Sequence, residues 1–356
     1  MNTPTANWMI YGANGYTGRL TVDAAVAHGL RPIVAGRSES KIRPIAEQHG
    51  LEWRAFGLDD QAGVRQAIRD CKAVLHCAGP FSATSKPMIQ ACLEEGVHYL
   101  DITGEIPVFA RAHRLSEEAA RRDVVLIPGV GFDVVPTDCL AARLVEKLPA
   151  ATHLTLAFEA AGGPSPGTAK TAAEGMTRGG CVRQDGELKL VPAAWKTRKI
   201  PFAHGERLAA TIPWGDVYTA FVSTGVPNIE VYLSMPPGRV KQLRRMRLLA
   251  PLMGLGFVQS WVKQRIESKV SGPSDETRAS SQSQLWGEVV SADGRRVTAS
   301  MTTPNGYDLT VAASLAITRH VLDNDIEGGY YTPSLLMGAD FAETLPGVSL
   351  EMSQPT

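Results

Sequence analysis

The sequence lacks the cysteine and histidine patterns that mark disulfide-bonded and metal-binding proteins. Its five cysteines are spread along the chain without a CxxC pair, which favours reduced thiols over a disulfide framework or a zinc knuckle. The eight histidines show no HxxH or HExxH spacing, so we expect no metal site. Net charge is also absent, because 36 Lys and Arg balance 36 Asp and Glu. A balanced chain has no overall field to attract nucleic acid, and we expect no such partner.

Signs of export are missing as well. The segment before the first predicted strand, Met1–Asn7, is short and polar, unlike a signal peptide. Together with the cysteine usage this predicts a cytoplasmic protein. A chain of 356 residues is too long for one simple core and fits two interlocked domains.

The first third of the chain alternates between short apolar segments and segments with helical spacing such as Ser82–Gly96. Strands that are apolar throughout are typical of a parallel sheet covered by helices on both faces. We therefore predict an α/β fold with a Rossmann, doubly wound parallel sheet. The predicted strands are Trp8–Tyr11, Pro32–Ala35, Ala73–Cys77, Tyr99–Ile102 and Val124–Ile127.

The pattern changes near Ala150, where strict alternation of apolar and polar residues begins. His153–Glu159 and Ile229–Leu233 both alternate, and Asp293-Gly294 lies between two further strand-like segments as a strong hairpin signal. Period two with hairpins predicts an antiparallel sheet with one face free to line a cavity or an interface.

These patterns divide the chain into three stretches. Residues 1–135 form the predicted Rossmann domain. Residues 136–305 form an inserted α+β antiparallel-sheet domain for the substrate and for dimerisation. Residues 306–348 form C-terminal helices that pack back on the Rossmann domain, and the remaining residues 349–356 are expected to fray.

A glycine-rich turn follows the first predicted strand and precedes a helix. It reads Gly12-Ala13-Asn14-Gly15-Tyr16-Thr17-Gly18, a G-x-x-G-x-x-G spacing in place of the simpler G-x-G-x-x-G. Phosphates approach closely where side chains are absent, and backbone N–H groups at a helix start attract them. The turn predicts dinucleotide binding, with an ordinary glycine turn as the alternative.

The end of the second strand favours a phosphorylated dinucleotide. An NAD-binding protein usually carries an acidic residue there, whereas this chain carries Arg37, whose planar, permanently charged guanidinium matches a 2′-phosphate. Ser38 and Lys41 add donors nearby. The sequence therefore predicts NADP(H), against the alternative of a solvated arginine. Asp59-Asp60 lies near the adenine or caps a helix.

Three loops after later strands have compositions suited to a reaction site: Cys77–Phe81, Asp101–Glu105 and Gly129–Asp133. The first would place backbone and Phe81 against the nicotinamide. Glu105 and Asp133 would orient substrate or donate a proton, unless they only cap a helix and stabilise a turn.

The candidate site residues fall into two sets. The predicted cofactor-binding residues are Gly12, Asn14, Gly15, Tyr16, Thr17, Gly18, Arg37, Ser38, Lys41, Asp59, Cys77, Ala78, Gly79, Pro80 and Phe81. The predicted catalytic residues are Asp133, Glu105 and Lys170.

These motifs resemble the saccharopine dehydrogenase-like NADP-binding family, most closely its branch of trans-acting enoyl reductases and saccharopine dehydrogenase-like oxidoreductases. Later motifs extend the resemblance over most of the chain: Gly162-Gly163 with Ser165, Gly167 and Thr168; Gly272-Pro273-Ser274 with Arg278; Trp286-Gly287-Glu288; Thr303-Pro304 with Gly306-Tyr307; and Thr332-Pro333-Ser334. The resemblance implies a Rossmann domain completed by C-terminal helices, an antiparallel substrate domain and a homodimer. It fixes the cofactor better than the substrate.

The least ordinary stretch is Arg239–Val270. Its centre, Leu248–Val258, is apolar apart from glycines and a proline, and basic residues flank it on both sides. Eleven residues are too few to cross a bilayer, which takes about twenty. The stretch is either a buried connector or dimer contact, or an interfacial segment that meets lipid or an acyl chain.

Three functions remain open. The leading hypothesis is an NADPH-dependent oxidoreductase that reduces an activated C=C, or a related unsaturated bond, of an apolar or acyl-chain substrate. The second is a C–N oxidoreductase of the saccharopine type, which would need a cluster among Arg178, Arg183, Arg198 and Arg207. The third is an NADPH-binding scaffold at lipid surfaces with little catalysis.

Overall fold

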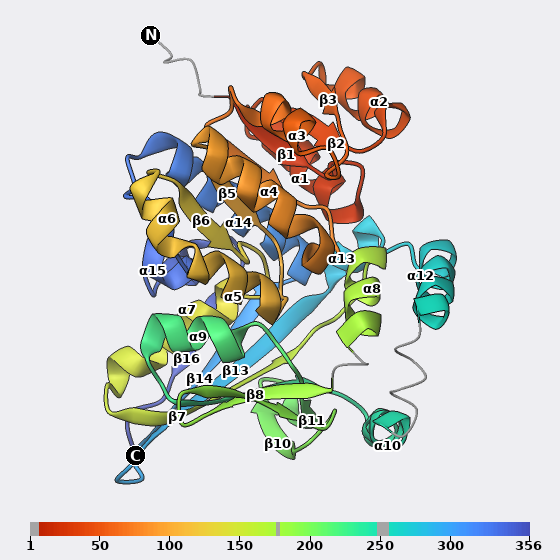
Figure 1. The fold of residues 1–356 in the computed structure, drawn as a ribbon. Coiled ribbons are helices and arrows are strands. Elements are labelled where there is room, and N and C mark those ends of the chain that lie inside the picture. Colours follow the sequence, from red (N-terminus) through yellow and green to blue (C-terminus); the bar gives the residue numbers. More distant parts are fainter. Residues whose placement is uncertain (1–6, 176–178, 248–255) are drawn as a thin grey trace. The chain divides into compact units, whose positions relative to one another are not determined.

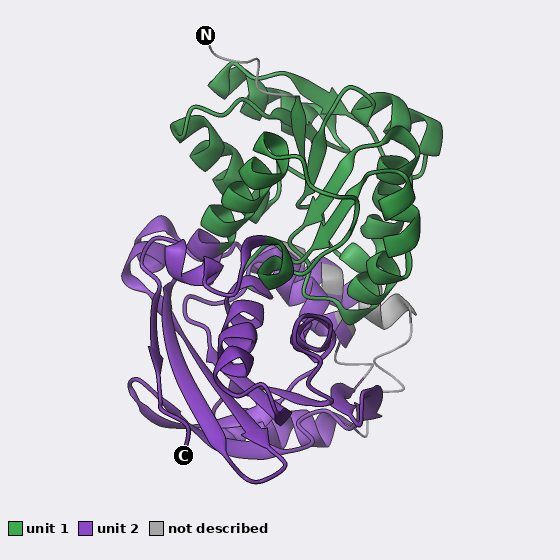
Figure 2. Ribbon diagram, turned by 90° about the vertical axis from the view of Figure 1, so that its left-hand side faces the viewer, with its two compact units in different colours: residues 1–132, 310–336 green, residues 133–309, 337–356 purple. Residues whose placement is uncertain are grey.

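The chain forms two compact units, which Figure 2 shows in different colours. The computed structural model describes residues 7–175, 179–247 and 256–356 (Figure 1). Unit 1 consists of residues 1–132 and 310–336, and unit 2 consists of residues 133–309 and 337–356. The chain therefore leaves unit 1 and later returns to it.

The described part of unit 1 contains a seven-stranded parallel sheet. Its strands are β1 (Trp8–Tyr11), β2 (Ile33–Gly36), β3 (Trp53–Ala55), β4 (Ala73–His76), β5 (His98–Asp101), β6 (Val125–Pro128) and β15 (Gly329–Tyr330). They lie in the order β15-β6-β5-β4-β1-β2-β3, and every pair is parallel. The strand order reverses between β1 and β4, where open α/β sheets have their ligand crevice.

Helices lie on both sides of this sheet (Figure 2). They are α1 (Tyr16–Ala27), α2 (Glu39–His49), α3 (Gln61–Ile68), α4 (Phe81–Glu95), α5 (Ile106–Arg114), α6 (Ser116–Arg121), α14 (Gly306–Asp323) and α15 (Pro333–Met337). Because helices cover both faces, every residue of β1, β2, β4 and β6 is buried. The predicted Rossmann sheet is confirmed.

The C-terminal part of the chain completes unit 1. Residues 310–336 carry the later part of α14 and β15, and β15 pairs in parallel with β6. The Lys72 Nζ donates a hydrogen bond to the carbonyl oxygen of Leu322 at 2.7 Å, which fixes the end of α14. The chain thus returns to unit 1 after unit 2, but only with residues 310–336, because residues 306–309 and 337–348 of the predicted returning stretch belong to unit 2.

Unit 2 is built on a mixed sheet. Its strands are β7 (Ala151–Glu159), β8 (Gly180–Gln184), β9 (Glu187–Val191), β10 (Thr197–Phe202), β11 (Gly205–Thr211), β12 (Asn228–Ser234), β13 (Gln282–Ser291), β14 (Arg296–Pro304) and β16 (Ser349–Met352). The order is β10-β11-β12-β7-β13-β14-β16, and the β8–β9 hairpin joins the sheet at β12. The predicted hairpin at Asp293-Gly294 is confirmed by the pairing of β13 with β14.

Two details of unit 2 differ from the sequence prediction. The sheet is not wholly antiparallel, because β7 and β12 pair in parallel. Alternation has the same period in either direction, so it cannot distinguish the two. The C-terminus does not fray either: β16 pairs with β14, and the Thr356 N–H donates to the Arg296 carbonyl at 3.0 Å. Four strand residues are too few to signal a strand.

The helices of unit 2 include α7, which packs on the sheet. They are α7 (Val135–Lys147), α8 (Pro166–Gly175), α9 (Asp216–Thr224), α10 (Pro237–Met246), α12 (Gly256–Lys269), α13 (Asp275–Ser280) and α16 (Phe341–Thr344). A Cβ on Gly287 would lie 2.6 Å from Leu144 Cδ1 of α7. The glycine of the Trp286-Gly287-Glu288 motif therefore allows close helix–sheet packing.

Candidate functional site

The turn after β1 requires glycine at two of its positions. Gly12 has a φ of +85°, and a Cβ there would lie 2.7 Å from the backbone nitrogen of Ala78. A Cβ on Gly18 would lie 2.3 Å from the carbonyl oxygen of Gly12. The glycines therefore let α1 and the loop after β4 close on the turn with no side chain between them.

The start of α1 supplies backbone donors at this turn. Gly15 is the N-cap, and no side chain of the described residues caps the helix. The first N–H groups of a helix have no partner within it, and the positive end of the helix dipole lies there too. The predicted residues Asn14, Tyr16 and Thr17 are half-buried at this point. The arrangement fits a pyrophosphate.

Arg37 and Asp59 come together around Tyr11. The Tyr11 hydroxyl donates to the Phe56 carbonyl at 3.0 Å. Burial raises the pKa of Tyr11 to about 12, while the charge of Arg37 lowers it and that of Asp59 raises it. Arg37 is exposed and forms no hydrogen bond or ion pair with the described residues. Its guanidinium is therefore available for a 2′-phosphate.

The neighbours of Arg37 and Asp59 have mixed roles. Ser38 is the N-cap of α2, and Lys41 is exposed on that helix. The Asp60 side chain accepts from the Gly63 backbone N–H and so caps α3. From the sequence, the Asp59-Asp60 pair was expected either to lie near the adenine or to cap a helix. Asp60 caps a helix, whereas Asp59 is exposed near Tyr11.

The loop after β4, Cys77–Phe81, is held by Glu105. The Glu105 carboxylate accepts hydrogen bonds from the backbone N–H groups of Phe81 and Ser82, both at 2.8 Å. The side chain is buried and caps α4. The sequence suggested that Glu105 would cap the helix that follows it. That helix is α5, and the Glu105 side chain makes no capping hydrogen bond to it. Glu105 therefore fixes the loop predicted to lie against the nicotinamide.

Asp101 joins the loops after β5 and β6. Its Oδ1 accepts from the backbone N–H groups of Thr103 and Gly129, both at 2.9 Å, and its Oδ2 accepts from the Tyr99 hydroxyl at 2.6 Å. Burial raises the pKa of Asp101 to about 6, although these hydrogen bonds oppose the shift. Sequence reasoning included Asp101 in a motif without assigning it this role.

Asp133 lies in unit 2 beside two buried carboxyl groups. It is half-buried, whereas Asp138 of α7 and Asp216 of α9 are completely buried. Burial raises the pKa of Asp216 well above its ordinary value, and the charges of Asp138 and Asp133 add to the shift. Ser223 donates to Asp138 Oδ1 at 2.7 Å. Among the described residues, no group of three His, Cys, Asp or Glu side chains is placed to hold a metal.

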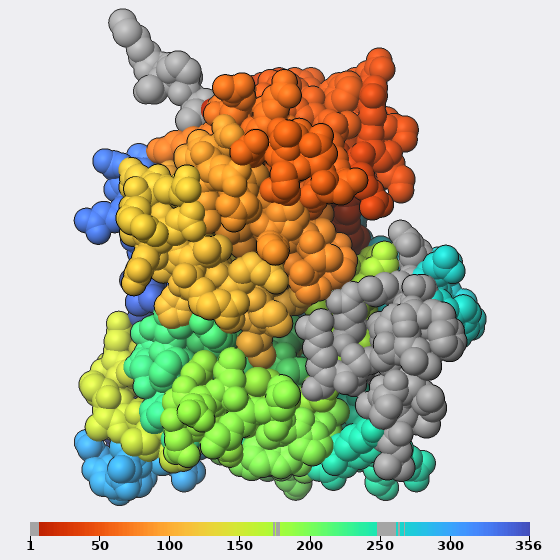
Figure 3. Space-filling view, in the orientation of Figure 1, coloured from red at the N-terminus to blue at the C-terminus, as the bar shows by residue number. Residues whose placement is uncertain are grey.

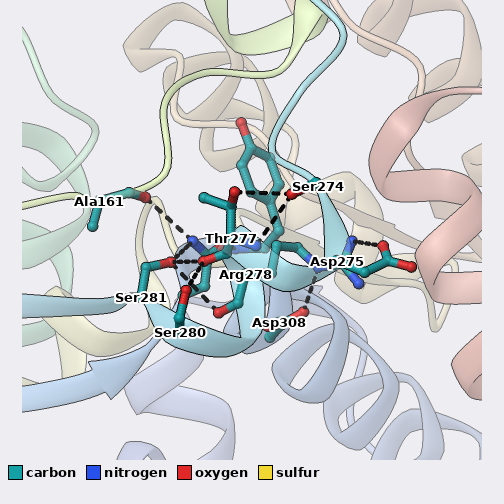
Figure 4. Close-up of polar contacts among 10 residues, drawn as sticks. Ala161, Ser274, Asp275, Thr277, Arg278, Ser280, Ser281 and Asp308 are labelled. Carbon is teal, nitrogen blue, oxygen red and sulfur yellow. Dashed lines mark hydrogen bonds and ion pairs between the residues drawn. The ribbon is translucent and has the colours of Figure 1, made fainter.

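Three of the motifs that carry the family resemblance converge at the start of α14 (Figure 4). Asn305 Nδ2 donates to the Ala161 carbonyl at 3.2 Å and to Ser281 Oγ at 2.8 Å. A Cβ on Gly162, where φ is +95°, would lie 2.8 Å from the Asn305 amide nitrogen. The glycine loop therefore packs directly on this asparagine.

Two ion pairs and a tyrosine complete the convergence. Arg278 pairs with Asp308 at 2.9 Å and with Asp275 at 3.1 Å (Figure 4). The Ser165 backbone N–H donates to the Tyr307 hydroxyl. Lys170, the predicted catalytic lysine, is half-buried on α8, whose first residues follow Ser165.

The C–N oxidoreductase hypothesis requires a cluster of arginines. The described arginines of that set bind other groups of the protein or are exposed. Arg183 Nε donates to the Val217 carbonyl at 2.8 Å beneath α9. Arg198 pairs with Glu288 at 2.8 Å. Arg207 is exposed on β11. The fourth, Arg178, lies outside the described residues.

The segment 239–270 is described in part, because 248–255 lies outside the described residues. In the part that is described, α10 and α12 flank this gap, and Trp261 of α12 is 58% exposed. The Arg265 guanidinium lies 5.4 Å from the centre of the Trp261 ring. None of the helices in the described part of the chain has the length and apolarity to cross a membrane.

Comparison with known proteins gives a family match to the first domain. Residues 8–127 match the family model described as the saccharopine dehydrogenase NADP binding domain. A saccharopine dehydrogenase-like oxidoreductase from Homo sapiens is 29% identical over 151 residues, which cover 36% of this chain and 35% of the relative. A trans-acting enoyl reductase from Mycobacterium leprae (strain TN) is 29% identical over 148 residues, which cover 39% of this chain and 35% of the relative. The chain spans about a third of the length of these relatives.

A solved structure resembles nearly the whole chain. Apo saccharopine dehydrogenase (L-Glu forming) from Saccharomyces cerevisiae has a TM-score of 0.67 and covers 99% of this chain and 100% of its own, at 11% identity. This likeness shows the fold alone. The family match confirms the predicted NADP cofactor and the resemblance that the motifs indicated. Residues 8–127 thus match the saccharopine dehydrogenase NADP binding domain, and over about a third of its length the chain is similar to saccharopine dehydrogenase-like oxidoreductases.

Proposed function

We propose that the protein is an NADPH-dependent reductase that acts on an activated C=C bond of an apolar or acyl-chain substrate. The observation that carries the proposal is the turn after β1 in unit 1, where Gly12, Gly18 and the start of α1 fit a pyrophosphate. Arg37 at the end of β2 is available for a 2′-phosphate. Similarity to a trans-acting enoyl reductase supports the choice of an enoyl substrate.

Arg37 tests the cofactor part of the proposal. One charge-assisted hydrogen bond contributes about 1.5–3 kcal/mol, so Arg37→Ala should weaken NADPH binding roughly 10- to 100-fold and leave NADH binding unchanged. The measurement is titration of protein fluorescence with each cofactor. Arg43→Ala is the matched control, since Arg43 is exposed on α2 and pairs with Glu47. An equal loss of NADH and NADPH affinity would contradict the assignment.

The chain must also supply a proton to the carbon next to the one reduced. NADPH supplies the hydride when it is bound. The candidates are Asp133, Glu105 and Lys170, and we favour Asp133. It is half-buried, its charge acts on the buried Asp216, and a positioned carboxyl group can serve as a general acid. Both oxygens of Glu105 accept backbone hydrogen bonds, which suits a clamp better than a donor.

A substrate panel separates the three candidate functions. NADPH oxidation with enoyl substrates supports the proposal, whereas turnover of imines or oxo acids alone supports the C–N alternative. Tight NADPH binding without oxidation across the panel supports a scaffold. The engagement of Arg183 with the Val217 carbonyl and of Arg198 with Glu288 argues against a substrate carboxylate site at these arginines.

We also propose that the protein is cytoplasmic and meets lipid peripherally through segment 239–270. Support comes from the exposed Trp261 on α12 and the basic residues of α10. Co-sedimentation with liposomes tests the contact: the protein should pellet with anionic vesicles, and Trp261→Ala should weaken the effect. No pelleting with neutral or anionic vesicles would refute it.

A homodimer is the remaining part of the proposal. Leu190 and Leu188 are 82% and 38% exposed on β9, an edge strand whose described partner is β8. The segment around β8 and β9 lies on the face shown in Figure 3, in yellow-green. Exposed apolar residues on an edge strand are suited to strand pairing between copies. Analytical ultracentrifugation of Leu190→Glu should show a smaller dimer fraction than wild type.

A further inference from the structure

A buried histidine and a half-buried threonine lie directly behind the Cys77–Phe81 loop. His76, the last residue of β4, is completely buried, and its Nε2 lies 3.0 Å from the Thr84 hydroxyl on α4. The Thr84 hydroxyl in turn lies 2.7 Å from the Ala78 carbonyl oxygen and 3.1 Å from that of Pro80. The two side chains thus connect the core of the sheet to two carbonyl groups of the loop.

The chemistry of these groups fixes the direction of the chain of hydrogen bonds. A carbonyl oxygen only accepts, so the single hydroxyl hydrogen of Thr84 must point to the loop. The Thr84 oxygen then accepts from His76, which assigns the ring proton to Nε2. His76 Nδ1 is left as a buried acceptor with no partner among the described residues.

The surroundings keep this imidazole neutral. The rings of Tyr11, Phe81 and Tyr99 lie around it, with ring centres 5.4, 5.4 and 6.2 Å from that of His76. Protonation would place a second N–H among these rings with no acceptor in reach. Burial accordingly lowers the pKa of His76 to about 3. The side chain is suited to holding a fixed hydrogen bond, not to exchanging protons.

The loop is therefore fixed from two directions. Thr84 holds the carbonyl groups of Ala78 and Pro80, and Glu105 holds the N–H groups of Phe81 and Ser82. The loop also packs against the turn after β1, because a Cβ on Gly12 would lie 2.7 Å from Ala78. The loop follows β4, which lies with β1 at the reversal in strand order, where open α/β sheets bind their ligands.

We propose that His76 and Thr84 are positioning residues for the nicotinamide half of NADP(H), acting through the carbonyl groups of the Cys77–Phe81 loop. The inference rests on the proposed placement of the nicotinamide against that loop. It predicts that loss of the relay weakens contacts with the nicotinamide end of the cofactor and leaves the adenosine end unaffected.

The test compares binding of NADPH with binding of 2′,5′-ADP, which carries the 2′-phosphate and adenine but no nicotinamide. Thr84→Val has nearly the shape of threonine and removes the hydroxyl, whereas Thr84→Ser retains it. His76→Phe keeps a ring in the site and removes the donor. Thr318→Val is the control, because Thr318 is a completely buried threonine of unit 1 whose hydroxyl has no partner among the described residues.

We expect Thr84→Val to lower NADPH affinity roughly 3- to 10-fold, which corresponds to one hydrogen bond, with 2′,5′-ADP affinity unchanged. Thr84→Ser should keep the NADPH affinity of the wild type. His76→Phe should lower NADPH affinity and leave 2′,5′-ADP affinity unchanged. Equal losses for both ligands in folded variants, checked by circular dichroism, would show a general structural role and overturn the proposal. Unchanged NADPH affinity in Thr84→Val or His76→Phe would also overturn it. Failure of the wild type to bind NADPH would instead refute the proposed function.

Discussion

Gly12→Ala tests whether the turn after β1 requires glycine because of its conformation or because of its neighbour. The positive φ of +85° costs an alanine about 1–2 kcal/mol. The new Cβ would also lie 2.7 Å from the backbone nitrogen and Cβ of Ala78, neither of which can rotate away. Overpacking of this kind costs about 1–3 kcal/mol more, so we expect about 2–5 kcal/mol of destabilisation in total.

Gly29→Ala is the control that separates the two costs. Gly29 has a similar φ of +73°, but no atom lies within 4 Å of the position that a Cβ would take there, so only the conformational cost applies. Thermal unfolding followed by circular dichroism measures both variants, at roughly 2–4 °C per kcal/mol. Gly12→Ala should also lose NADPH affinity, because Ala78 must move. Equal melting temperatures for the two variants, with NADPH binding intact, would refute the steric argument.

Two further predictions concern buried carboxyl groups. Glu105→Gln replaces one acceptor oxygen by an NH₂ group that faces a backbone N–H, so it should destabilise the protein by about 1–3 kcal/mol in urea unfolding; an unchanged urea midpoint would contradict the clamp. Burial raises the pKa of Asp216, so the folded protein retains a proton that the unfolded chain releases above about pH 4. Wild-type stability should therefore fall as pH rises above that value, and Asp216→Asn should flatten the slope. Urea unfolding at about pH 5 and about pH 8 measures this pH dependence in both proteins. An equal change in unfolding free energy between the two pH values for wild type and Asp216→Asn would argue against a raised pKa of Asp216.

The sequence was sufficient for the parts of the site that depend on backbone. The glycines of the turn, the strand before it and the helix after it are local features, and Arg37 follows directly from the end of β2. Their positions could be predicted because a strand, a turn and a helix in succession leave few arrangements. The hairpin at Asp293-Gly294 is local in the same sense.

What the sequence did not reveal depends on side chains that meet from distant segments. Glu105 caps a helix that begins 24 residues earlier, and no local pattern signals a cap of that kind. The same holds for the parallel pairing of β7 with β12, since the residues between them include β8 to β11 and α9. His76 gave no signal because a histidine in an apolar strand looks like any core residue.

The clamp by Glu105 has a consequence for the orientation of the dinucleotide. Two helices, α1 and α4, begin at the edge of the sheet where the strand order reverses, and either positive end would attract an anion. At α4 a carboxylate of the chain itself already occupies that position. We therefore expect a diphosphate bridge to bind at α1, with one end of the dinucleotide toward β2 and the other toward β5.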